Sequence, residues 1–241
     1  MTAYETVLQA MLALKNDEQK NVLERFFKTG KGQYGEGDLF LGIKVPQSRA
    51  VAKQHYKSCS LNDLHKLVQS PFHEVRLVAL LILALQYKHD KTNPEYVNFY
   101  LSHTKFVNNW DLVDLSCYEI LGDWLLDKDR SVLYRLSDKG NSIWEQRIGI
   151  VSTMQFLRHN QLDDTYAIAD IFLAKPSPLH DLLQKAVGWL LREAGKRDTE
   201  RLTQFLAKRY LHMPRTMLRY AIEKYPDGVR RQFLDGTFGL K

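Results

Sequence analysis

The stretch Asn108-Asn109-Trp110-Asp111-Leu112-Val113-Asp114 lies near the middle of the chain and predicts the start of a helix. An apolar stripe continues from it at helical spacing, and its members are Val113, Cys117, Ile120, Leu121 and Trp124. At about 100° per residue, Trp110 falls within this stripe and Asp114 falls at its edge. The spacing therefore predicts a half-sheltered carboxylate beside an indole ring on one helix face.

The two carboxylates of this stretch have different explanations. Asp111 lies in the predicted first turn, behind an asparagine cap, where an acid complements the helix dipole. Asp114 lies beyond that turn, so the dipole does not account for it. We interpret Asp111 as a helix-start residue and Asp114 as a side chain that could hold a fixed negative charge in an enzyme.

Helical patterns extend along the rest of the chain. Thr2 is expected to cap a first helix, and Ser60 and Asp63 form a predicted capping box. Further helices are expected at about 17–28, 47–57, 60–69, 72–88, 94–103, 129–138, 142–159, 162–174, 178–195, 198–210, 214–225 and 228–235. The seven prolines fall at the predicted boundaries, as their missing N–H groups require. Residues 30–37 are rich in glycine but lack a Gly-Lys-Ser/Thr ending, so we expect a loop rather than a phosphate cradle.

These patterns predict an all-α fold. The predicted helices and their short connectors are compatible with a globular bundle or with a curved α-solenoid of degenerate HEAT-like antiparallel helix pairs. We rank the solenoid first and expect residues 1–241 to form a single domain. A curved stack offers a concave surface suited to a long ligand.

Composition excludes several other classes. No run approaches 18 consecutive apolar residues, and the first residues lack the basic and apolar regions of a signal peptide. Cys59 and Cys117 are too few for a disulfide framework, and no motif predicts a metal or cofactor site. We therefore expect a cytoplasmic protein, with no membrane contact and no cofactor.

Positive charge is concentrated near the end of the chain. Residues 185–241 hold 13 Lys and Arg against 6 Asp and Glu, a surplus of +7, whereas the first 184 residues carry −1. A local basic surface suits a polyanion such as nucleic acid, and the alternative is a solvated charged face.

Three helical segments combine aromatic and basic residues. Residues 144–148 include Arg147, which could bind a phosphate or form a surface ion pair. Residues 185–193 begin with Lys185 and include Trp189, and Gly188 within this helix hints at close approach of another backbone or of a ligand. Residues 213–220 include Arg215 and Arg219, and Arg215 lies at a predicted helix start, where a basic side chain is unfavourable unless an anion lies nearby.

Residues 109–114, 144–148 and 185–193, in this order, resemble the AlkD-type DNA alkylation repair glycosylases, and residues 40–46 and 213–220 also match this family. The resemblance spans nearly the whole chain. It implies a stack of HEAT-like repeats that binds duplex DNA and excises N3- and N7-alkylated purines by hydrolysis of the N-glycosidic bond.

The resemblance also implies roles for individual residues. Its catalytic carboxylate corresponds to Asp114, its active-site tryptophans to Trp110 and Trp189, and its active-site arginine to Arg147. Contacts with DNA are expected from the basic residues Lys44, Arg49, Lys185, Arg192, Arg215 and Arg219. The expected protein is a monomer that needs no metal and associates with the nucleoid through DNA. Two alternatives remain: a non-catalytic paralogue that binds damaged or branched DNA, and a helical scaffold for another protein.

Overall fold

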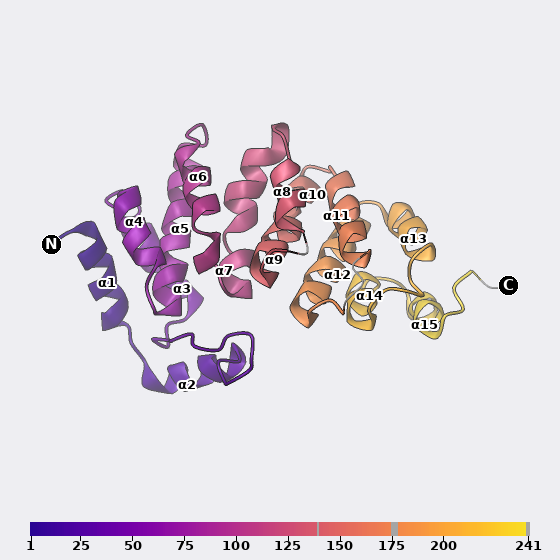
Figure 1. Cartoon of the computed structure of the whole chain (residues 1–241), viewed down its shortest axis with the longest axis horizontal. Helices are drawn as coiled ribbons and strands as arrows, with labels where there is room; N and C mark the ends of the chain where they lie inside the picture. Colours follow the sequence, from indigo (N-terminus) through magenta and orange to yellow (C-terminus); the bar gives the residue numbers. More distant parts are fainter. Residues whose placement is uncertain (139, 175–177, 240–241) are drawn as a thin grey trace. The chain divides into compact units, whose positions relative to one another are not determined.

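The structure is a computed structural model that describes residues 1–138, 140–174 and 178–239. Within these ranges it has helices and no β-strand, apart from an isolated bridge between Leu39 and Phe72. The predicted all-α class is confirmed. The helices cluster into two compact units, Met1–Ile120 and Leu121–Lys241 (Figure 1). The curved solenoid and the single domain stay predictions.

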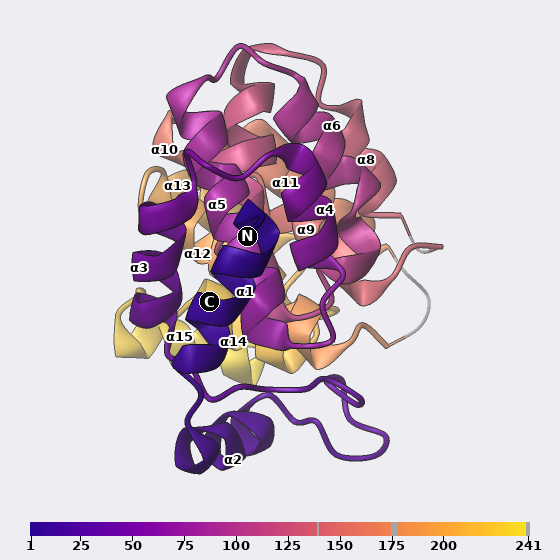
Figure 2. The ribbon, with the colours of Figure 1, turned by 90° about the vertical axis from the view of Figure 1, so that its left-hand side faces the viewer.

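The first unit is organised around one apolar helix. Its helices are α1 (Ala3–Ala13), α2 (Asp17–Phe26), α3 (Val45–His55), α4 (Leu61–Val68), α5 (His73–His89), α6 (Glu95–Ser102), the 3₁₀ helix η1 (Thr104–Phe106) and α7 (Trp110–Asp114). Helix α5 is buried along most of its length and packs against α1, α3, α4, α6 and α7. Helix α2 has no buried residue and lies apart from the other helices of its unit (Figures 1 and 2).

Local capping explains where several of these helices begin. Thr2 and Glu5 form a capping box at α1, and Ser60 and Asp63 form the predicted one at α4, with the Asp63 amide 3.2 Å from the Ser60 hydroxyl. Each side chain satisfies backbone N–H groups that have no partner inside the helix. No helix in the described part of the chain is long and apolar enough to cross a lipid bilayer.

The second unit is organised around α12. Its elements are the 3₁₀ helix η3 (Leu125–Asp127), α8 (Ser131–Leu136), α9 (Ile143–Val151), α10 (Met154–Arg158), α11 (Asp163–Leu173), α12 (Asp181–Gly195), α13 (Thr199–Ala207), α14 (Arg215–Ala221) and α15 (Asp227–Asp235). Helix α12 packs against α9, α10, α11, α13 and α14. A Cβ atom on Gly188 would lie 2.5 Å from the carbonyl oxygen of Met217. The predicted close approach to Gly188 is therefore confirmed, and it comes from the backbone of α14.

Two expected helices are broken in the structure. The predicted helix 142–159 divides into α9 and α10 at Ser152 and Thr153, where the Thr153 hydroxyl donates to the Ile150 carbonyl at 2.7 Å. The helix that begins at Trp110 ends at Asp114, and a π-helix, η2 (Tyr118–Gly122), follows the turn. In both places hydroxyl side chains compete for the backbone carbonyls of the preceding turn. Pro176, expected at a boundary, lies outside the described residues.

Candidate functional site

The start of α7 places Trp110 and Asp114 in one cavity. Asn109 caps the helix by accepting the Trp110 N–H at 2.8 Å, and its extended backbone turns the chain into α7. Trp110 and Asp114 are both half-buried, and both line a cavity of about 440 Å³ inside the first unit. The prediction that they share a helix face is confirmed, and so is the half-sheltered position of Asp114.

Aromatic rings form much of the wall of this cavity. The indole of Trp110 stacks on Phe27, with ring centroids 5.3 Å apart and planes inclined by 25°. Phe27 stacks in turn on Phe40 at 5.1 Å, and the edge-on ring of Phe26 lies 5.8 Å from Trp110. Phe26 is 60% exposed, so one end of the ring cluster is open to solvent. Ring faces carry partial negative charge, and an aromatic cavity therefore favours a cationic group.

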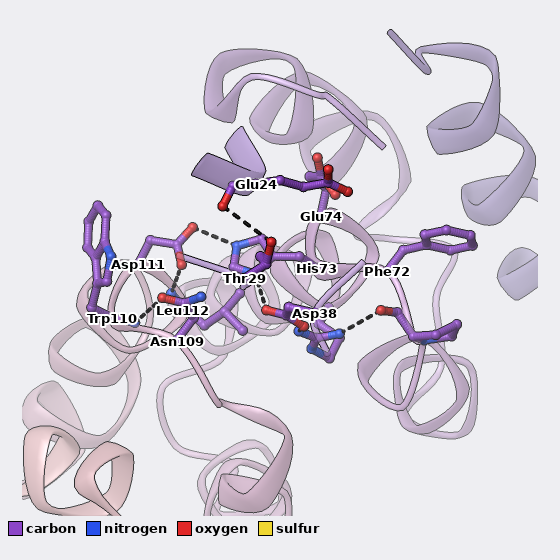
Figure 3. Close-up of polar contacts among 12 residues, drawn as sticks. Glu24, Thr29, Asp38, Phe72, His73, Glu74, Asn109, Trp110, Asp111 and Leu112 are labelled. Carbon is purple, nitrogen blue, oxygen red and sulfur yellow. Dashed lines mark hydrogen bonds and ion pairs between the residues drawn. The ribbon is translucent and has the colours of Figure 1, made fainter. Parts of the chain in front are cut away.

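A network of buried charged side chains borders the cavity. His73, the first residue of α5, lies between two carboxylates, with Nδ1 3.1 Å from Asp38 and Nε2 2.8 Å from Asp111 (Figure 3). All three side chains are buried. The imidazole also stacks on Phe40, with centroids 4.5 Å apart. Because both ring nitrogens face carboxylates, both can donate only when His73 is protonated.

The electrostatics of the network follow from its geometry. Burial alone would lower the pKa of His73, but the charge and hydrogen bond of Asp111, together with Asp38, raise the pKa to about 9. Burial pushes the pKa of Asp38 upward, yet the hydrogen bond with His73 and the charge of Arg76 bring it below its usual value. The network therefore places the protonated imidazole of His73 between Asp38 and Asp111, and the Arg76 guanidinium forms a further ion pair with Asp38.

These contacts add a second role to the predicted helix-start role of Asp111, which is confirmed. Asp111 lies in the first turn of α7 and accepts the Leu112 N–H at 2.9 Å through one carboxylate oxygen, while the other oxygen contacts His73 (Figure 3). Asp111 joins the start of α7 to the start of α5. The network thereby fixes the orientation of the turn that carries Trp110 and Asp114.

A third buried carboxylate, that of Glu74, positions another part of the cavity wall. Glu74 accepts the backbone N–H groups of Leu41, Gly42 and Ile43 at 2.9, 2.8 and 3.1 Å. Three such bonds hold this irregular segment against α5. The segment continues into Lys44, the exposed N-cap of α3, which also lines the cavity.

The second unit contains two other predicted site residues. Arg147 is buried in α9, and its Nη1 donates to the Leu182 carbonyl at the start of α12 at 2.5 Å. Trp189 is half-buried on α12. Each unit thus holds two of the four predicted catalytic residues, and their assembly into one site stays a prediction.

The predicted DNA-contact residues differ in their surroundings. Lys44 and Arg49 are exposed in the first unit. Lys185 pairs with Asp181 at 2.7 Å, and Arg192 pairs with Glu223. The Arg215 guanidinium donates to the Leu234 carbonyl, and Arg219 is exposed.

Four further basic residues near the end of the chain form ion pairs with acidic residues, and two of these acidic residues lie outside residues 185–241. These pairs are Lys196–Glu193, Arg201–Asp163, Arg209–Asp170 and Arg230–Asp227. Lys241, which contributes to the counted surplus, lies outside the described residues. The sequence surplus therefore overstates the unpaired positive charge of this region.

Several residues of the site were missed in the sequence, namely His73, Asp38, Glu74 and the phenylalanines of the aromatic cluster. One signal was present: His73, Glu74 and Arg76 are polar residues at the start of the most apolar helix. Buried polar residues in such a helix need partners, and these partners come from distant segments.

The structure is an all-helical protein whose first unit contains an aromatic cavity lined by the carboxylate of Asp114. A family model described as DNA alkylation repair enzyme matches residues 7–225, and the chain belongs to this family. The fold is also similar to that of a predicted DNA alkylation repair enzyme from Enterococcus faecalis, with a TM-score of 0.68 and 19% identity over 88% of this chain and 97% of that chain. No curated protein matches the sequence. The family match confirms the resemblance noted in the sequence and implies DNA as the partner.

Proposed function

We propose that the protein is a DNA glycosylase that hydrolyses the N-glycosidic bond of N3- and N7-alkylated purines in duplex DNA. The observation that carries the proposal is the shared cavity of Asp114 and Trp110, which combines a carboxylate with aromatic walls. The family to which the chain belongs repairs alkylated DNA, and this supports the substrate class.

The proposed reaction does not require a general acid. An N3- or N7-alkylated purine is cationic, so the electrons of the broken C1′–N bond neutralise it and it leaves without prior protonation. Positive charge then develops on the deoxyribose, and the carboxylate of Asp114 would stabilise that oxocarbenium-like state. Water adds to C1′ and gives up one proton, for which Asp114 is the proposed acceptor. The products are the free base and an abasic site.

The remaining residues have supporting roles in this proposal. The faces of Trp110 and Trp189 would stabilise the developing cation by about 0.5–2 kcal/mol each. Arg147 would contact the adjacent phosphate, and its bond to the Leu182 carbonyl ties that position to the start of α12. The basic DNA contacts proposed are Lys44, Arg49, Lys185, Arg192, Arg215 and Arg219.

The direct test is release of free 7-methylguanine from a duplex that contains it, measured by chromatography, with strand cleavage followed in parallel. We expect wild-type protein to release the base and leave the strand intact until alkali is added. If the protein releases base no faster than buffer does, the proposal fails.

The alternative is a non-catalytic protein that binds damaged or branched DNA. It predicts salt-dependent binding of the same duplex without base release, and Asp114→Asn should leave that binding unchanged. The acidic, aromatic cavity favours the glycosylase, because a protein that only binds the DNA backbone has no need of a half-buried carboxylate beside an indole.

A further inference from the structure

A second cavity, of about 640 Å³, lies between α3 and α5 in the first unit. One wall is a helical stripe of α3 and the residue that follows it, formed by Arg49, Ala52, Lys53 and Tyr56. The facing wall is a stripe of α5 with the same i, i+3, i+4, i+7 spacing, formed by Leu81, Ala84, Leu85 and Lys88. His89 and Glu119 complete the lining. The cavity is thus an apolar floor with a mainly cationic rim.

The cations of the rim differ from several of those near the end of the chain. Within the described ranges, Arg49, Lys53 and Lys88 form no hydrogen bond or ion pair through their side chains, and all three are exposed. Glu119 is the carboxylate that lines the cavity with them. By contrast, Lys185 and Arg192 each pair with an acid. The α3–α5 cavity therefore presents a net positive charge, because three cations without an ion-pair partner among the described residues face the single carboxylate of Glu119.

Helix dipoles explain only part of this arrangement. Lys53 lies in the last turn of α3 and Lys88 in the last turn of α5, where cations stabilise the negative helix ends. Arg49 lies nearer the start of α3, where the dipole gives no such benefit. The dipole also gives no reason for the apolar floor between the two stripes.

We propose that this cavity binds an unstacked nucleotide of a DNA strand. Its phosphate would contact Arg49, Lys53 and Lys88, and its base would cover the apolar floor and the ring of Tyr56. A phosphate alone would leave the floor exposed, and a fully stacked duplex has no free base to fill it. Cavities of 300–1,000 Å³ with apolar walls and a few charged groups are typical of small-molecule sites, and single-stranded nucleic acid is commonly held by cations beside an aromatic ring. This inference rests on the proposed function for its DNA partner.

The test compares a duplex that carries one bulged adenosine with the same duplex fully paired, using the full-length protein and fluorescence anisotropy. We expect tighter binding of the bulged duplex. Inorganic phosphate, deoxyadenosine and 5′-dAMP serve as competitors, and 5′-dAMP should compete best because it fills both parts of the cavity.

The double variant Lys53→Ala/Lys88→Ala should raise the Kd for the bulged duplex by about tenfold for each lost cation. Its matched control is Lys31→Ala/Lys66→Ala, which removes two exposed lysines of the same unit that do not line the cavity. The control should keep the preference for the bulged duplex. Circular dichroism establishes that both variants are folded.

Equal affinity for the two duplexes would overturn the proposal, as would competition by phosphate that matches competition by 5′-dAMP. Competition by 5′-dAMP without a preference for the bulge would assign the cavity to free nucleotides and would also overturn it. Base release separates this inference from the proposed function: a protein that binds the bulge through Lys53 and Lys88 but releases no 7-methylguanine loses only the glycosylase proposal.

Discussion

The buried imidazole of His73 makes the stability of the first unit depend on pH in a specific window. Its pKa is raised from the ordinary 6.5 to about 9 because Asp111 and Asp38 stabilise its protonated form. Below pH 6.5 the imidazole is protonated in both folded and unfolded chains, so the stabilisation is fully present. It is lost as the pH rises through 9, where the folded protein must release the proton as well.

The magnitude follows from the same two values. A rise of the pKa from 6.5 to about 9 corresponds to about 3 kcal/mol of free energy of unfolding. We therefore expect the free energy of unfolding to fall by about this amount between pH 6.5 and pH 9.5. The variant His73→Gln should lack this fall and should be less stable at pH 6.5 by about 3–5 kcal/mol, since it leaves the buried carboxylate of Asp111 without its cationic partner and Asp38 with Arg76 alone.

Urea denaturation at several pH values, followed by circular dichroism, measures both effects. The control is His89→Gln, because His89 is exposed in the last turn of the same helix. It should keep the pH dependence of the wild-type protein. If wild type and His73→Gln lose the same free energy between pH 6.5 and pH 9.5, the charged network does not work as described.

Three further predictions concern packing and the cavity. Gly188→Ala should lower the free energy of unfolding by about 1–3 kcal/mol, because the new Cβ would lie 2.5 Å from a backbone oxygen of α14. Gly228→Ala, in α15, meets open space and should leave the free energy of unfolding unchanged or raise it by up to about 1 kcal/mol; thermal melts compare the two variants. Glu74→Gln should lower the free energy of unfolding, measured by urea denaturation, by about 2–3 kcal/mol, because one of three backbone N–H groups would face an amide NH₂. The control Glu119→Gln changes an exposed side chain and should leave the free energy of unfolding nearly unchanged. Trp110→Phe keeps an aromatic ring in the cavity, so we expect base release to slow about 2–10-fold while DNA binding persists, and loss of binding would contradict this role.

Short-range patterns predicted much of the fold from the sequence. Capping at Thr2 and Ser60 depends on residues three positions apart, and the apolar stripe after Trp110 depends on helical spacing. The glycine at position 188 correctly signalled a close backbone because its cost in a helix required a reason. The half-sheltered position of Asp114 followed from the same periodicity.

Interactions over long sequence separations could not be predicted in this way. Asp111 lies 38 residues from His73, so the sequence offered only its local role at a helix start. The basic surplus could be counted, but the pairing of Arg201 with Asp163, again 38 residues away, requires the folded chain. The break at Ser152 also depends on packing, because Gly122 approaches its carbonyl so closely that a Cβ there would lie 2.4 Å away.

The most direct test of the central claim is the single-turnover rate of 7-methylguanine release by wild type, Asp114→Asn and Asp127→Asn. Asp127 is an exposed carboxylate outside the cavity, so its variant controls for a change in net charge. Asp111→Asn is unsuitable as a control because Asp111 is bonded to His73. We predict that Asp114→Asn slows release by about 100-fold or more at saturating protein, as expected when a charge-stabilising group is removed, while Asp127→Asn matches wild type. Equal rates for wild type and Asp114→Asn would contradict the assignment of Asp114.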